Sequence, residues 1–224
     1  MTKRRSGAKT TDMAFLVFEG LDGSGKSTLI QRLSAHLRSI QKSVTLTHEP
    51  GGTPLAEDIR HLILRTEGEA PVPRAELLLY QASRAQHVDT VIKPLLKHED
   101  SWILCDRFTG STLAFQCGGR GLDRTDVDRL NKYATDGVKP DLWVLLDLSL
   151  EESLRRRQSR EDSGGKDEDR LEKEKSTFHE NVRSYYLQLA KAEAENWLVL
   201  NAEQTQDELF ENLLSALRER KWLV

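Results

Sequence analysis

Residues 15–28, FLVFEGLDGSGKST, constrain the fold more than any other part of the chain. A short apolar run leads into a glycine-rich loop, which opens into a segment with helical spacing of apolar residues. Gly20, Gly25, Lys26 and Ser27 match GxxxxGK[ST], the pattern of a phosphate-binding loop. Its backbone N–H groups and the N-terminus of the next helix bind phosphate oxygens. The alternative is a chance glycine-rich turn with a solvated lysine, and the flanking apolar runs argue against it.

In a loop of this kind the lysine reaches the terminal phosphates of a nucleotide, and the hydroxyl after it ligates Mg²⁺. We therefore expect ATP and Mg²⁺ here, with Lys26 as a catalytic cation and Ser27 as a metal ligand. The residues expected to bind ATP in this loop are Gly20, Asp22, Gly23, Ser24, Gly25, Lys26, Ser27 and Thr28.

Five short apolar runs recur along the chain, at residues 14–18, 44–47, 102–105, 142–146 and 197–200. Uninterrupted runs of this length are typical of strands buried on both faces, as in a parallel sheet. Segments with helical spacing lie between them. The sequence therefore predicts an α/β fold of the P-loop NTPase type, a three-layer sandwich with a five-stranded parallel sheet flanked by helices.

Helix boundaries are indicated at several places. Thr53 is expected to cap a helix that has Pro54 in its first turn. Residues 74–96 are expected to be helical, with Pro94 disturbing the last turn, and a further helix is expected over 124–136. Thr205 and Glu208 have the spacing of a capping box ahead of the last helix.

Domain organisation follows from composition. Residues 1–12 are basic and without apolar periodicity, so we expect a disordered tail, with an organelle address as the alternative. Residues 13–224 are expected to form one domain, which contains a charge-dense stretch at about 155–171.

Charge and hydropathy exclude several classes of function. The net charge of −3 and pI of about 6.1 do not favour a nucleic-acid partner. The sequence has no run of 18 apolar residues and its first residues lack the apolar core of a signal peptide, so we expect neither a membrane span nor secretion. Cys105 and Cys117 have no metal or redox spacing, so we expect a reducing, cytoplasmic location.

Asp106 ends a predicted strand, at the sheet edge where open α/β folds bind ligands. Its carboxylate can hold Mg²⁺ partly through water, and Arg107 can bind a phosphate with two hydrogen bonds. A surface ion pair between the two is the alternative. Asp147 is a rival metal ligand in the same kind of position, and we interpret it instead as a cap of the following helix.

The chain resembles the bacterial-type thymidylate kinases, P-loop nucleoside monophosphate kinases. The motifs that carry the resemblance occur in family order from residue 15 to 224: GLDGSGKS at 20–27, EPGGT at 49–53, DRF at 106–108, STLAFQ at 111–116, GGRG at 118–121, DRLE at 169–172 and an Asn-Ala turn at 201–202. The resemblance implies ATP-dependent phosphorylation of dTMP to dTDP by a homodimer.

The resemblance also implies a dTMP site. Tyr80 is expected to stack on thymine and Arg84 to bond a base carbonyl, although alone they would be interpreted as a core residue and a solvated charge. Asp22 is expected to bond the sugar 3′-hydroxyl and Arg107 the monophosphate. The remaining residues expected at this site are Glu49, Ser111, Thr112 and Gln116, with a polar helix N-terminus as the alternative for Ser111.

The resemblance also implies that 13–224 form one kinase domain and that the charge-dense stretch at about 155–171 is its lid. The loop at 20–25 contains no arginine, so the lid is expected to supply the one that neutralises the transferred phosphoryl group. Arg160 is expected to have this catalytic role, and Arg156 to pack on adenine. For Arg155 and Arg157 a solvated helix face is the preferred interpretation.

Two other functions remain open from the residues. A kinase for another mononucleotide, such as dUMP or CMP, would need nearly the same site, because one methyl group discriminates only about 10- to 200-fold. A GTPase switch would need a guanine-binding NKxD motif. Asn131-Lys132 is followed by Tyr133-Ala134, which argues against it.

Overall fold

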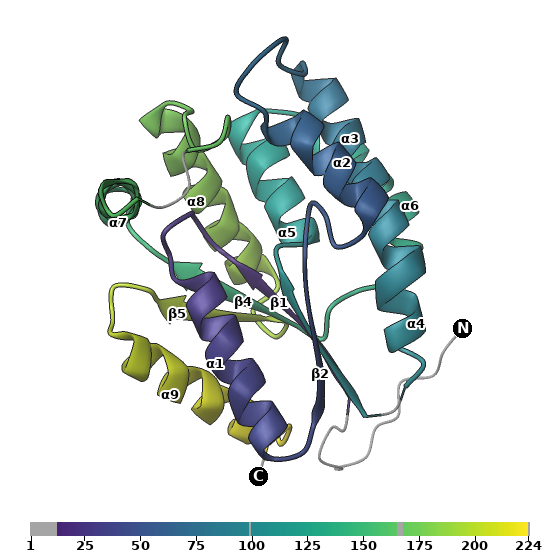
Figure 1. Ribbon diagram of the computed structural model, residues 1–224, viewed down its shortest axis with the longest axis vertical. Helices are drawn as coiled ribbons and strands as arrows, with labels where there is room; N and C mark the ends of the chain where they lie inside the picture. Colours follow the sequence, from purple (N-terminus) through teal and green to yellow (C-terminus); the bar gives the residue numbers. More distant parts are fainter. Residues whose placement is uncertain (1–12, 99, 165–167, 224) are drawn as a thin grey trace.

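The structure is a computed structural model that describes residues 13–98, 100–164 and 168–223. The predicted tail at 1–12 lies outside the described residues, as do residues 165–167 of the predicted lid. A single five-stranded sheet, entirely parallel, has the order β2-β3-β1-β4-β5 (Figure 1). Its strands are β1 (Ala14–Glu19), β2 (Ser43–His48), β3 (Ser101–Asp106), β4 (Leu142–Asp147) and β5 (Trp197–Asn201). All five predicted strands are confirmed, each longer by one or two residues.

The helical segments alternate with the strands. They are α1 (Lys26–Ser39), α2 (Pro54–Leu64), α3 (Pro73–His87), η1 (Val88–Ile92), α4 (Lys93–Leu95), α5 (Thr109–Thr112), η2 (Leu113–Gly119), α6 (Arg124–Thr135), α7 (Leu150–Asp162), α8 (Ser176–Ala192) and α9 (Gln206–Glu219). Thr53 caps α2 through Ala56 N, and the Thr205–Glu208 capping box of α9 is present, so both predicted caps are confirmed.

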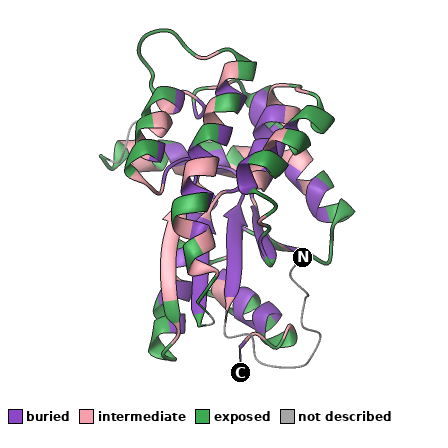
Figure 2. Ribbon diagram, turned by 90° about the vertical axis from the view of Figure 1, so that its right-hand side faces the viewer, coloured by how far each residue is buried: buried purple, intermediate pink, exposed green. Residues whose placement is uncertain are grey.

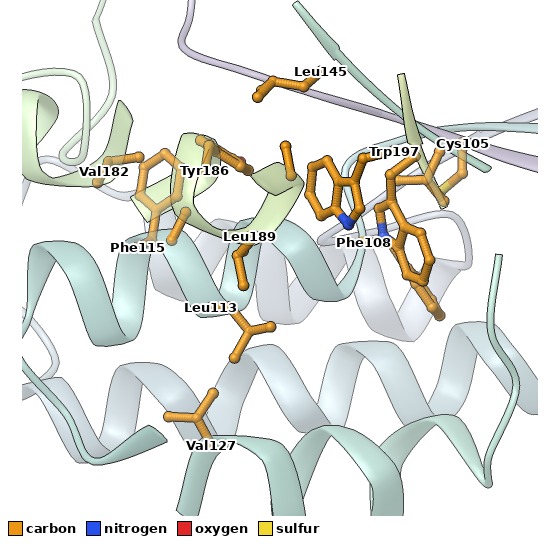
Figure 3. Close-up of a cluster of buried hydrophobic side chains, with 14 of the residues drawn as sticks. Cys105, Phe108, Leu113, Phe115, Val127, Leu145, Val182, Tyr186, Leu189 and Trp197 are labelled. Carbon is orange, nitrogen blue, oxygen red and sulfur yellow. The ribbon is translucent and has the colours of Figure 1, made fainter. Parts of the chain in front are cut away.

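Strand β1 separates two apolar cores. Phe15 and Val17 face a core built with α3, η2, α6 and α8, whereas Leu16 and Phe18 face a core built with α1 and α9. Figure 2 shows the central strands buried between the layers, and Figure 3 shows part of the first core, including Val182. The predicted three-layer α/β sandwich is confirmed.

Three details differ from the sequence prediction. Pro94 was expected to disturb the last turn of one helix, but the irregularity precedes it, as the π-helical segment η1. Proline has no N–H to donate to the carbonyl four residues earlier, and its ring crowds the preceding turn, so the local widening falls before it. Helix α8 was not predicted at all. Asp147 does not cap α7, because its carboxylate accepts two hydrogen bonds from Arg183 and the cap position is Ser149.

In the described part of the chain, no helix combines the length and apolar character needed to span a membrane. The carboxyl ends of β1, β3 and β4 meet at one sheet edge, from which the glycine loop, the Asp106–Arg107 turn and the connection to α7 emerge. This edge positions the site.

Candidate active site

The glycine loop joins β1 to α1. Gly20 has φ of 136°, and a Cβ there would collide with the carbonyl oxygen of Leu146, so only glycine fits this turn. Gly25 also has positive φ, and α1 begins directly after it at Lys26. The N-terminus of α1 therefore opens onto the loop, which is the arrangement that binds phosphate.

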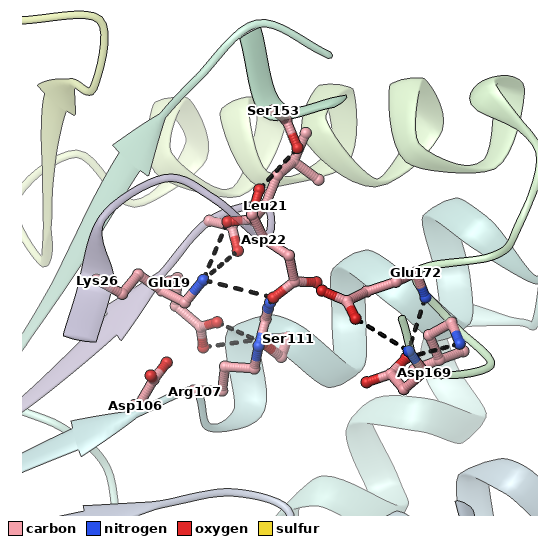
Figure 4. Close-up of polar contacts among 12 residues, drawn as sticks. Glu19, Leu21, Asp22, Lys26, Asp106, Arg107, Ser111, Ser153, Asp169 and Glu172 are labelled. Atoms are coloured by element: carbon pink, nitrogen blue, oxygen red, sulfur yellow. Dashed lines mark hydrogen bonds and ion pairs between the residues drawn. The ribbon is translucent and has the colours of Figure 1, made fainter. Parts of the chain in front are cut away.

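Lys26 lies across the inside of the loop. Its buried Nζ donates to the carbonyl oxygens of Gly20 at 3.1 Å and Leu21 at 3.0 Å, and lies 3.9 Å from Asp22 Oδ1 (Figure 4). Burial lowers the pKa of Lys26, and the nearby guanidinium of Arg107 lowers it further.

Arg107 is the centre of the polar cluster shown in Figure 4. Its backbone has φ of 68°, which is unusual for a residue with a side chain. The guanidinium donates to Asp22 Oδ1 at 2.7 Å, to Ser111 Oγ at 3.2 Å and to Tyr186 Oη at 3.3 Å. Burial alone would raise the pKa of Asp22, but the charges of Arg107 and Lys26 outweigh it and hold that pKa below its ordinary value.

Glu19, the last residue of β1, is fully buried behind this cluster. One carboxylate oxygen accepts from the backbone N–H groups of Phe108 and Ser111, at 3.1 and 3.0 Å. The other accepts from the hydroxyls of Ser111 and Tyr186, at 2.5 and 2.9 Å. Burial raises the pKa of Glu19, although the hydrogen bond from Ser111 and the charge of Arg107 oppose the shift. Glu19 thus holds the Asp106–Ser111 turn in place.

Two cavities meet at this cluster. The loop cavity is lined by residues 22–23 and 25–28 of the glycine loop together with Asp106, Arg156 and Arg160. The inner cavity is lined by Tyr80, Arg84 and Phe115, among others. Four residues line both cavities: Asp22, Glu49, Arg60 and Arg107. Gly20 and Ser24, also predicted to bind ATP, are buried residues of the loop and are not among those that line the loop cavity.

Arg84 is held by several partners at the wall of the inner cavity. Its Nε donates to Glu49 at 2.7 Å, and Nη1 donates to Thr112 Oγ1 and Asn131 Oδ1, both at 2.8 Å. The other Glu49 oxygen pairs with Nδ1 of buried His87 at 2.8 Å. Both oxygens of Glu49 are therefore already hydrogen-bonded to protein groups. The main effect of Glu49 on the inner cavity is to hold Arg84 in position.

Tyr80 and Gln116 flank the same region. Tyr80 lines the inner cavity, and burial raises the pKa of its hydroxyl. Gln116 is fully buried and is not among the residues that line the cavity. Its Nε2 donates to Glu76 at 2.8 Å, while its Oε1 is buried without a hydrogen-bond partner. A buried acceptor in that state is uncommon, which leaves this oxygen without a role inside the protein.

Ser27 and Asp106 are placed as a metal site of this kind requires. Ser27 Oγ lies 3.4 Å from Asp106 Oδ2, and Asp106 Oδ1 is buried without a hydrogen-bond partner. No cluster of three or more His, Cys, Asp or Glu side chains suited to a metal exists within the described ranges. The residues fit Mg²⁺, which commonly takes one or two protein oxygens and completes its shell with water and phosphate.

The lid arginines take different positions. Arg160 lines the loop cavity and pairs with Glu172 at 2.9 Å. Arg156 donates to the carbonyl oxygens of Gly23, at 3.3 Å, and Ala202, at 3.0 Å. Arg155 is exposed and pairs with Glu152, as expected for a solvated residue. For buried Arg157 that interpretation is wrong, because its Nη1 donates to the carbonyl oxygen of Glu172 at 2.7 Å.

Sequence reasoning missed two residues of the cluster. Glu19 had a signal, since a single acid ends an otherwise apolar strand. Tyr186 lies on unpredicted α8, whose buried Phe178, Val182, Tyr186 and Leu189 have helical spacing that could have identified it. Arg60, which lines both cavities and donates to the carbonyl oxygen of Pro50 at 2.8 Å, had no comparable signal.

Comparison with known proteins places this geometry in context. The family described as thymidylate kinase matches residues 18–213. A thymidylate kinase of Bdellovibrio bacteriovorus is 55% identical over 211 residues, which cover 94% of this chain and 98% of the relative. One from Geotalea daltonii is 46% identical over 196 residues, or 87% and 91% of the two chains. The crystal structure of thymidylate kinase from Ehrlichia chaffeensis is similar with a TM-score of 0.73 and 30% identity, covering 92% of this chain and 98% of that one.

Proposed function

The chain belongs to the thymidylate kinase family, and from this premise we propose how its two cavities divide the substrates of the reaction. The enzyme phosphorylates dTMP to dTDP and uses ATP. The loop cavity is assigned to ATP and the inner cavity to dTMP. The observation that carries this assignment is the wall that the two cavities share, where Arg107 from the turn after β3 is bonded to Asp22 of the phosphate loop.

Direct in-line transfer accounts for the reaction without a protein nucleophile. Phosphoryl transfer depends mainly on positioning and on neutralising charge. Lys26 holds the donor phosphates, Arg107 binds the acceptor phosphate, and Arg160 meets the charge that develops between them. Ser27 and Asp106 would hold Mg²⁺, which when bound neutralises and orients the phosphates of ATP.

Recognition of the acceptor nucleoside is assigned to α3, η2 and the loop. Tyr80 stacks on thymine, Arg84 bonds a base carbonyl, and Asp22 bonds the 3′-hydroxyl of the sugar. The unpartnered Oε1 supports Gln116 as an acceptor for the base. Ser111 and Thr112 act chiefly by fixing Arg107 and Arg84, to which they are hydrogen-bonded.

We assign the binding of the adenine ring of ATP to Arg156. Its guanidinium connects the loop with the turn at Ala202, and the aliphatic part of such a side chain can pack on a flat base. We place the lid at about 155–171 within one kinase domain spanning 13–224.

Turnover with a panel of monophosphates tests the function. We expect ATP-dependent turnover with dTMP to exceed that with dUMP by about 10- to 200-fold, because a single methyl group distinguishes them. CMP and AMP should be poorer still. Equal ATP turnover with and without dTMP would contradict the assignment.

Tyr80→Ala is expected to raise the KM for dTMP about 5- to 150-fold while leaving the KM for ATP unchanged, because stacking contributes about 1–3 kcal/mol. Tyr80→Phe is the matched control, since it keeps the ring and loses only the hydroxyl. Steady-state kinetics with each substrate varied in turn would measure both. A selective ATP defect, or an equal loss in Tyr80→Phe, would contradict stacking.

We propose a homodimer in the cytoplasm. Large apolar side chains are exposed on the helices beside the sheet: Leu55 and Leu62 on α2, Leu78 on α3 and Tyr133 on α6. A second copy covering them would account for this exposure. Both cysteines, Cys105 and Cys117, are free, which suits a reducing compartment.

A further inference from the structure

Glu76 is a buried carboxylate outside the catalytic cluster. It lies on α3, one helical turn before Tyr80, and none of its surface is exposed. Besides Gln116, two arginines bond to it: Arg120 through Nε at 3.1 Å and Nη2 at 3.0 Å, and Arg170 through Nη2 at 2.5 Å. Each of these arginines is only 14% exposed, so the charges meet with little water between them.

The two arginines connect Glu76 to one tight turn. We call residues 169–174 the lid turn. Arg120 also pairs with Glu174 at 2.7 Å, and Arg170 is itself part of the turn. The Arg170 Nε donates to the carbonyl oxygen of Ile63 at 3.0 Å, near the end of α2. Helix α3, through Glu76, and the end of α2, through Ile63, thus hold the lid turn in place.

The lid turn also reaches the loop cavity. The Asp169 carboxylate accepts from the backbone N–H groups of Leu171 and Glu172, at 2.9 and 3.0 Å, which makes the turn stiff (Figure 4). Glu172 then pairs with Arg160, whose guanidinium lines the loop cavity. Asp169 and Leu171, which flank Arg170, line the inner cavity.

We propose that Glu76 is a positioning residue that docks the lid turn onto the inner cavity and thereby sets the position of Arg160. This rests on the proposed roles of Arg160 and of the inner cavity. When Glu76 holds Arg170, Asp169 and Leu171 close the inner cavity on the lid side. Glu172 is then placed to hold Arg160 beside the phosphates.

Glu76→Gln is the sharpest test, because it keeps the side chain's size but removes the charge and replaces one acceptor oxygen with an NH2 donor that cannot accept from the arginines. We expect the KM for dTMP to rise at least about tenfold and kcat to fall at least about tenfold, since a buried charge pair loses one partner. Amide exchange in peptides covering 168–178 should be faster than in the wild type. Glu180→Gln, on the exposed surface of α8, is the control and should change none of these.

A coupling measurement separates positioning from a general loss of stability. Arg170→Gln should reproduce the defects, and adding Glu76→Gln to it should cost less than about twofold more, because both changes release the same turn. Thermal unfolding identifies any variant that fails to fold. If Glu76→Gln is such a variant, the amide-exchange measurement on Arg170→Gln decides the proposal by itself.

The two possible failures are distinguishable. If the wild-type enzyme does not phosphorylate dTMP, the proposed function fails. If it does, but Glu76→Gln and Arg170→Gln leave the exchange of the lid turn and the KM for dTMP unchanged, Glu76 is not a positioning residue. Fully additive effects in the double variant would also contradict the proposal.

Discussion

Arg160→Ala is expected to lower kcat by at least about two orders of magnitude with little change in the affinity for ATP. An arginine that meets charge on a transferred phosphoryl group contributes about 10³ to 10⁵ in rate. The glycine loop has no arginine of its own, and Arg160 lines the loop cavity from the lid. Because its contribution arises in the transition state, the loss should appear in kcat and not in ground-state binding of ATP.

Arg155→Ala is the matched control for this experiment. Arg155 is on the same helix, but it is 69% exposed and its guanidinium pairs with Glu152. Single-turnover kinetics together with equilibrium binding of ATP would measure both variants. An unchanged kcat in Arg160→Ala would move the catalytic role to Arg156 or Arg170, and an equal loss in Arg155→Ala would point to a change in α7 as a whole.

Arg107→Lys is expected to lower kcat/KM for dTMP by about two to three orders of magnitude, although it preserves the positive charge. The guanidinium reaches Asp22, Ser111 and Tyr186 at once, and an ammonium cannot reproduce this planar set of donors. Hydrogen bonds to charged groups contribute about 1.5–3 kcal/mol each, and a loss of about 3–4 kcal/mol corresponds to the expected change in rate.

Arg124→Lys, a comparable change in an exposed arginine of α6, should leave kcat/KM within about twofold. Initial rates at varied dTMP and saturating ATP give the comparison. A defect confined to the KM for ATP would show that Arg107 serves the donor and not the acceptor.

The sequence predicted the frame of the molecule well, because its signals are local. Apolar runs identify the strands directly, although the edge strands β2 and β5 are not buried on both faces as the runs suggested. Thr53 and Thr205 mark helix starts by chemistry that involves only neighbouring residues. The glycine loop and the Asp106–Arg107 turn follow from strand ends in the same way. Helix α8 was missed although its buried apolar residues have helical spacing, because the charge-dense stretch that precedes it has no apolar pattern to mark where the helix begins.

Contacts between distant residues could not be predicted in the same way. Nothing in the local pattern shows that Asp147 faces Arg183 or that Glu49 uses both oxygens on Arg84 and His87. Gln116 was expected to line the cavity, but it is bonded to Glu76 instead, and its role toward dTMP stays a prediction. Such partnerships depend on which faces the folded helices present to one another.

The position of Glu19 bears on how changes in substrate choice can arise. Glu19 holds the Asp106–Ser111 turn, which carries Arg107, and the next residue, Gly20, begins the glycine loop. In the proposed arrangement the alignment of the two phosphates therefore depends on two adjacent residues, the last of β1 and the first of the loop, and such fixed positioning supplies a high effective concentration of the reacting groups. Residues that contact the base, such as Tyr80, lie on a different element. Base preference can accordingly diverge among descendants of this enzyme while the reaction geometry is inherited unchanged.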